Sequence, residues 1–212
     1  MVTKEQRFFN SEIELRADDG KNIIRGYAVK YDQLSRPIGW GFREKFSRGA
    51  FDSILASDTK NVEFDTICKF EHDITLGRRS SGTLQIGSDE IGLWYEIDLP
   101  GTTTGKDVAE LVRRGDIRHS SFAFIVAKGG EQWEEREADG EVRTINKVSY
   151  LKDVSPVSDP AYPQTEGLES VKRSYEEWKK ENKPENEEEI KEDWNAQYRA
   201  RHLELLNKQL NF

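Results

Sequence analysis

The sequence predicts a mainly β protein with a few helices (α+β), built as a β-barrel or a curled antiparallel sheet that carries helices on its outside. Segments rich in β-branched and aromatic residues recur as far as Pro163, and turn-forming residues such as Gly, Asp and Asn separate them. The connections between these segments are short, which favours antiparallel neighbours. Only two stretches of this region have the spacing of apolar residues that is typical of a helix.

About seven strands are expected in chain order. They are residues 7–17, 23–32, 61–71, 82–87, 93–99, 122–126 and 142–158, the last as one long strand or two. A turn at residues 18–22 joins the first two strands, and a turn at residues 88–92 closes a hairpin. Pro and Gly residues argue against a regular element at residues 35–49, and the polar segment 129–140 is expected to be a mobile loop.

The two expected helices have recognisable ends. Ser47 could cap a short helix that continues to Leu55. The longer helix starts near Thr104, which with Asp107 fits a capping box, and it stops at Gly115.

Composition limits the classes of function. The chain has 212 residues and a formal net charge of -8, which argues against a nucleic-acid-binding protein because such proteins usually carry a basic face. No apolar run approaches the length of a membrane span, and the N-terminus lacks the apolar core of a secretory signal. The single cysteine, Cys68, excludes an internal disulfide and fits a reducing cytoplasm. We therefore expect a soluble intracellular protein with no membrane partner.

The composition changes at Thr165. Residues 1–164 are expected to form the folded domain, and residues 165–212 a charged linker followed by an amphipathic tail. Most residues of 171–193 are charged. The last part places Ile190, Trp194, Tyr198 and Leu205 at near-helical spacing, which predicts a helix that binds a partner. A solvated, partly disordered tail is the alternative.

One strand of the centre of the chain presents a serine in an unusual setting. In the stretch SSFAFIV, Phe122 and Phe124 point to one face, and Ser121 and Ala123 point to the other. The large side chains can pack a core, so the opposite face carries a hydroxyl group beside a methyl group. Ser121 could therefore be a nucleophile or simply a small polar residue on a solvent face.

The histidines and carboxylates favour acyl transfer over metal or cofactor chemistry. A zinc site from His72 and His119 would lack further ligands at a suitable spacing, so no metal and no cofactor are expected. A serine becomes nucleophilic when an imidazole takes its proton and a third group orients that imidazole. Ser121, His72 and Asp153 would suffice if their strands are neighbours, and His119 competes with His72 as the base. Spacing alone does not choose between the two histidines.

Five segments occur in an order and at spacings that resemble the prohead proteases of tailed bacteriophages. These segments lie between residues 26 and 163, and they read GYAVKYD, FREKFSRGAFDSIL, FEHDITLGRRSSGTLQI with GLWYEIDLP, GKDVAELVRRGDIRHSSFAFIV, and YLKDVSPVSDPAYP. The resemblance implies a serine endopeptidase and a fold shared with the herpesvirus assembly proteases.

The resemblance also implies roles for individual residues. The histidine of the His-Asp pair, His72, would be the base, and Ser121 rather than Ser120 the nucleophile. Asp153, in the segment LKDVS, would be the third member of the triad. The family often has Gly where this chain has Ala123. Because the herpesvirus enzymes use a second histidine, His119 remains the alternative to Asp153.

The implied activity belongs to phage assembly. The enzyme would act in the host cytoplasm, inside the assembling procapsid, where it would cleave the scaffold or the scaffold-like segment of the capsid protein as well as itself. A homo-oligomer is compatible with this expectation. The alternative is a non-catalytic assembly protein that uses the same fold to bind capsid or scaffold subunits.

Overall fold

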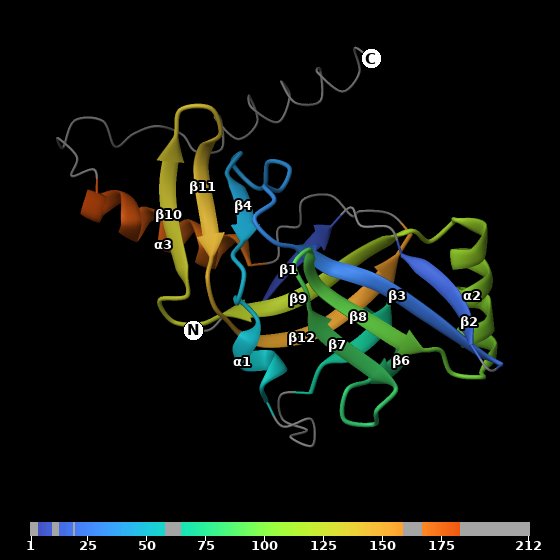
Figure 1. Ribbon diagram of the computed structural model, residues 1–212. Helices are drawn as coiled ribbons and strands as arrows, with labels where there is room; N and C mark the ends of the chain where they lie inside the picture. The colour runs from blue at the N-terminus through green and yellow to red at the C-terminus, as the bar shows by residue number, and fades with distance from the viewer. Residues whose placement is uncertain (1–3, 10–12, 19, 58–64, 159–166, 183–212) are drawn as a thin grey trace, which may run out of the picture.

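Three β-sheets and three helices make up the part of the chain that the structure describes (Figure 1). The structure is a computed structural model, and it describes residues 4–9, 13–18, 20–57, 65–158 and 167–182. The expected mainly β class with a few helices is confirmed. The described residues form twelve strands rather than about seven. The expected segments 7–17 and 142–158 each divide between two sheets, and three further strands, Arg43–Phe46, Ile74–Arg78 and Glu131–Arg136, form where no strand was expected.

The largest sheet has five strands in the order β1-β9-β12-β5-β6. Their bounds are β1 Glu5–Phe9, β9 His119–Val126, β12 Val148–Val157, β5 Ile67–Phe70 and β6 Ile74–Arg78. β9 pairs antiparallel with β1 and β12, whereas β12 and β5 run parallel. The parallel pair departs from the expected antiparallel arrangement. That expectation assumed short connections between neighbouring strands, whereas six other strands separate β5 from β12 along the chain.

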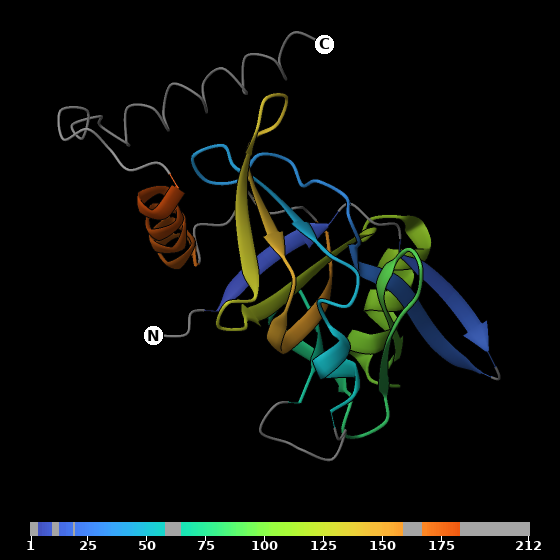
Figure 2. The same cartoon turned by 60° about the vertical axis from the view of Figure 1, so that its left-hand side comes forward.

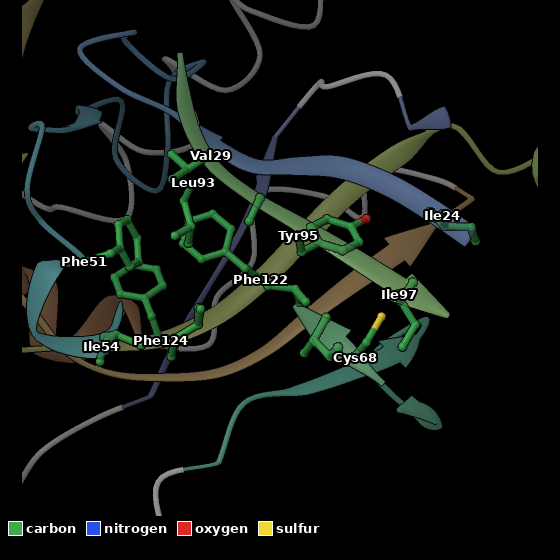
Figure 3. Close-up of a cluster of buried hydrophobic side chains, with 14 of the residues drawn as sticks. Ile24, Val29, Phe51, Ile54, Cys68, Leu93, Tyr95, Ile97, Phe122 and Phe124 are labelled. Carbon is green, nitrogen blue, oxygen red and sulfur yellow. The ribbon is translucent and has the colours of Figure 1, made fainter. Parts of the chain in front are cut away.

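A second sheet of four antiparallel strands packs over the first. Its order is β2-β3-β8-β7, with β2 Glu14–Asp18, β3 Lys21–Lys30, β8 Gly92–Asp98 and β7 Leu84–Ser88. The main core lies between the two sheets, where Phe122 and Phe124 of β9 cluster with Leu93 and Tyr95 of β8 (Figure 3). The predicted inward orientation of Phe122 and Phe124 is therefore confirmed.

The two packed sheets are not closed into a barrel. In the described residues, β1 and β6 are the outer strands of one sheet, and β2 and β7 are those of the other. The expected barrel or single curled sheet is replaced by two layers with separate edges.

A third sheet lies beside the two packed sheets and has a helix across one face (Figure 1 and Figure 2). Its order is β10-β11-β4, with β10 Glu131–Arg136, β11 Gly140–Ile145 and β4 Arg43–Phe46, and the helix is α3, Leu168–Asn182. A second apolar cluster lies between them and contains Ile38, Phe42, Trp133, Val171 and Tyr175. The first part of the expected charged linker is therefore a packed helix, and the expected helix near Trp194 lies outside the described residues.

The segment 129–140, expected to be a mobile loop, supplies strand β10 of an antiparallel hairpin with β11. The expectation was wrong because β10 has a single buried residue, Trp133. An outer strand with a single buried aromatic residue has almost no hydrophobic alternation to detect. In the same way, β4 lies within the segment expected to be irregular.

The remaining helices are α1, Asp52–Leu55, and α2, Thr103–Arg114. Gly115 ends α2 in the left-handed conformation, with a φ of 81°, as the sequence predicts. The start differs from the expected Thr104, because the side chain of Thr102 accepts a hydrogen bond from the amide of Gly105. No helix in the described ranges is both long and apolar enough to cross a membrane.

Candidate active site

Ser121 lies in the middle of β9, which is paired on both sides. Phe8 of β1 and Ser155 of β12 are its partners in the two ladders. Ser121 is only 4% exposed, so the alternative of a serine on a solvent-exposed face is wrong. A side chain on a central strand is held rigidly, since its backbone is hydrogen-bonded to both neighbours.

His72 lies in the tight turn that joins β5 to β6. The amide of Asp73 donates to the carbonyl of Phe70, and the two central residues, Glu71 and His72, have positive φ values of 51° and 58°. Positive φ at both central positions is the pattern of a type I′ turn, which Gly and Asn adopt more readily than Glu or His. The local conformation therefore costs free energy that the surrounding structure must offset.

Contacts with the end of β12 hold this turn in place. The amide of Glu71 donates to the carbonyl of Pro156, and the Glu71 carboxylate accepts a hydrogen bond from the amide of Ser158 at 2.7 Å. These two bonds connect the turn that carries His72 to the strand that carries Asp153. The strained turn is therefore fixed relative to its partner strand.

Asp153 is buried at an irregular point of β12. The register against β9 shifts between Leu151, opposite Phe124, and Asp153, opposite Ala123. Such a bulge changes the direction in which a strand presents its side chains. Asp153 is only 3% exposed, and a buried carboxylate of this kind needs a hydrogen-bonding partner.

The structure brings Ser121, His72 and Asp153 together. His72 Nε2 lies 2.7 Å from Ser121 Oγ, and His72 Nδ1 lies 2.5 Å from Asp153 Oδ1. When Nδ1 carries the proton that it donates to Asp153, Nε2 has a lone pair directed at the Ser121 hydroxyl group. This is the arrangement in which an imidazole can remove a proton from a serine as it attacks a carbonyl carbon.

His119 lies at the start of β9, two residues before Ser121. Among the described residues, the imidazole with hydrogen-bond distances to both Ser121 and Asp153 is that of His72. His119 precedes Ser121 on the same strand, so its imidazole would have to bend back to reach the hydroxyl group.

Two groups that the sequence reasoning did not identify contact Ser121, His72 or Asp153. Ser121 Oγ lies 2.9 Å from the backbone carbonyl oxygen of Arg7, a second acceptor beside His72 Nε2 for its one proton. Ser155 Oγ lies within hydrogen-bond distance of both His72 and Asp153. The sequence contains a signal for Ser155, because a residue two positions after Asp153 points to the same face of a strand. It contains none for a backbone carbonyl contributed by another strand.

A buried ionic network anchors β1, the strand that supplies this carbonyl. The Arg7 guanidinium group binds Glu5 at 2.6 Å and Glu44 at 2.7 Å, and Arg143 bridges the same two carboxylates. Burial alone would raise the pKa of Glu5, but hydrogen bonds and charge from Arg143 and Arg7 outweigh it and hold that pKa below its ordinary value. The network links β1 to the three-stranded sheet, since Glu44 lies on β4 and Arg143 on β11.

Cys68 is a structural residue rather than a second nucleophile. It is 0% exposed in the main core. Burial, with a smaller contribution from the charge of Asp153, raises the pKa of its thiol group far above the ordinary value. A thiol that stays protonated is a poor nucleophile.

No group of three or more His, Cys, Asp or Glu side chains in the described part of the chain is arranged to hold a metal ion.

Comparisons with known proteins identify the family of the chain and a similar fold. The model of a family described as caudovirus prohead serine proteases matches residues 11–181. Among solved structures, the capsid assembly protease of bacteriophage T4 is similar, with a TM-score of 0.50 and 9% sequence identity over 74% of this chain and 98% of that chain. At this identity the likeness concerns the fold alone. No curated protein gives a significant sequence match.

Proposed function

The chain belongs to the family of caudovirus prohead serine proteases, and on this premise we propose that it is a serine endopeptidase whose catalytic triad is Ser121, His72 and Asp153. The observation that carries the proposal is the pair of hydrogen-bond distances at His72, 2.7 Å to Ser121 Oγ and 2.5 Å to Asp153 Oδ1. Family membership supports the reaction class, and the geometry supports the role proposed for each residue.

Each step of the reaction follows from these contacts. Ser121 Oγ attacks the scissile carbonyl carbon while His72 Nε2 takes its proton, and Asp153 stabilises the imidazolium through Nδ1–H. His72 then gives the proton to the leaving amine, the peptide bond breaks, and an acyl-enzyme remains. A water molecule, deprotonated by His72, hydrolyses this ester and restores the Ser121 hydroxyl group.

The substrates that we propose are proteins of the immature capsid. They are the scaffold or a scaffold-like segment of the major capsid protein, and the protease itself, cleaved inside the procapsid in the host cytoplasm. A family of capsid-maturation proteases and a fold shared with the T4 capsid assembly protease support this substrate class. The fold relationship to herpesvirus assembly proteases, and assembly into a homo-oligomer, belong to the same proposal.

A direct test compares two adjacent serines. Ser121→Ala should abolish self-cleavage and cleavage of co-expressed capsid protein, because it removes the attacking oxygen atom. Ser120→Ala should retain most activity, since the Ser120 hydroxyl group binds Tyr95 in the core. Intact mass measured over time follows both reactions.

The reverse result, with Ser120 required and Ser121 dispensable, would show that the assigned nucleophile is wrong. Wild-type chain that cleaves neither itself nor capsid protein, yet still enters procapsids, would favour the non-catalytic assembly protein instead.

A further inference from the structure

Ser155 contacts both residues that prepare the nucleophile. Its hydroxyl group donates to Asp153 Oδ1 at 2.9 Å and lies 3.1 Å from His72 Nδ1. The residue is 0% exposed, so water does not compete for these bonds. Ser155 follows Asp153 by two positions on β12, which places both side chains on the same face of the strand.

The three groups form a closed pattern of hydrogen bonds in which each proton has an acceptor. The proton on His72 Nδ1 has Asp153 Oδ1 as its near acceptor and the Ser155 oxygen as a second one. The proton of the Ser155 hydroxyl group goes to Asp153 Oδ1. This pattern requires the proton to be on Nδ1, so it favours the tautomer in which Nε2 is free to accept the proton of Ser121.

We propose that Ser155 is a positioning residue of the active site, which holds the Asp153 carboxylate and the Nδ1–H tautomer of His72 in the orientation needed for proton transfer. The inference rests on the proposed function and adds a fourth side chain to it. Ser155 acts through Asp153 and His72, on the side of the imidazole away from Ser121. Its loss should therefore lower the rate of proton transfer and leave substrate binding unchanged.

The chain offers a matched control for the loss of a buried hydroxyl group. Ser120 on β9 is also 0% exposed, and its hydroxyl group makes a hydrogen bond to Tyr95 at 2.9 Å. Ser120→Ala and Ser155→Ala thus remove the same atom from equally buried positions. Only Ser155 contacts His72 and Asp153. A general effect of lost packing would therefore lower activity in both variants, whereas a positioning effect would lower it in Ser155→Ala alone.

The experiment measures how fast Ser121 in the full chain reacts with a fluorophosphonate probe, together with kcat and KM for a peptide that the wild-type chain cleaves. Ser155→Ala should lower the labelling rate and kcat by roughly ten- to a hundredfold, the effect of losing one hydrogen bond to a charged group. KM should stay within about twofold, because a residue that does not touch substrate adds nothing to its binding. Ser120→Ala should keep the wild-type labelling rate.

A double-mutant cycle distinguishes positioning from an independent effect. In a chain that already carries Asp153→Asn, adding Ser155→Ala should cause little further loss, because the carboxylate through which Ser155 acts is gone. Wild-type kcat in Ser155→Ala, or a full additional loss in the Asp153→Asn background, would overturn the proposal. If Ser155→Ala does not fold, Ser155→Thr and Ser155→Val provide the same comparison. Threonine keeps the hydroxyl group, and valine has a methyl group in its place.

The failure of the proposed function has a different signature. In that case the wild-type chain would not react with the probe, or Ser121→Ala would still react. A labelled wild type, an unlabelled Ser121→Ala and an unaffected Ser155→Ala would instead reject the role of Ser155 alone.

Discussion

At the scale of single residues, His72 and His119 should behave very differently if Ser121 is the nucleophile, as proposed. His72→Ala should lower kcat by several orders of magnitude, because the members of a triad act as a unit and the remaining serine has no base. His119→Ala should cost far less, since the imidazole at hydrogen-bond distance from Ser121 is that of His72. Kinetics of peptide cleavage by both variants check this. Equal losses would indicate a triad with two histidines, in which Asp153 is structural.

At the scale of an element, β1 depends on its buried ionic network for stability. Glu5→Gln should lower the free energy of unfolding at neutral pH by about 3–5 kcal/mol, the cost of removing one partner from a buried ion pair. The pKa of Glu5 is lowered in the folded chain. Its contribution is therefore present above the ordinary pKa of a glutamate and is lost as the pH falls through the lower, folded-state value. Urea denaturation at several pH values measures both effects.

The matched control for this element is Glu14→Gln on β2. Glu14 forms an ion pair with Arg16 in which both side chains are more than half exposed, so its removal should change stability by less than about 1 kcal/mol at any pH. If Glu5→Gln behaves like Glu14→Gln, the network does not anchor β1. Because the carbonyl of Arg7 contacts Ser121, a displaced β1 should also alter the labelling rate of that serine.

At the scale of the whole molecule, the packing of α3 decides where the folded unit ends. The composition places the boundary at residues 164–165, and that boundary remains a prediction. However, Val171 and Tyr175 of α3 are buried against Phe42 and Trp133. A chain cut after Pro163 should therefore lose roughly 3–6 kcal/mol, at 1.5–3 kcal/mol for each of the two apolar side chains that leave the cluster. Thermal unfolding measures the loss.

A chain cut after Asn182 serves as the comparison, because it keeps α3 and removes only residues 183–212. It should unfold at the wild-type temperature and still cleave peptide, while its incorporation into procapsids should fall if the tail binds scaffold or capsid. Equal stability of the two truncated chains would mean that α3 contributes nothing to the folded unit, as the boundary at residues 164–165 implies.

The sequence by itself determined the features that depend on near neighbours along the chain. Gly115 ends α2 because a glycine adopts the left-handed conformation at little cost, and the alternation around Phe122 and Phe124 points both rings into the core. The choice of Ser121, His72 and Asp153 as candidates also came from the sequence, through the order of five segments. Where the sequence signal was weak, as at the single buried residue Trp133 of β10, the element was missed.

Only the tertiary structure decided which candidates meet. His72 is 49 residues from Ser121 and 81 residues from Asp153, and the register of β5, β9 and β12 determines whether such distant residues touch. The same holds for the Arg7 carbonyl, 114 residues from Ser121, and for the packing of α3. Periodicity and turn chemistry act over a few residues, whereas strand pairing and the contacts between sheets depend on how the whole chain shares its buried surface.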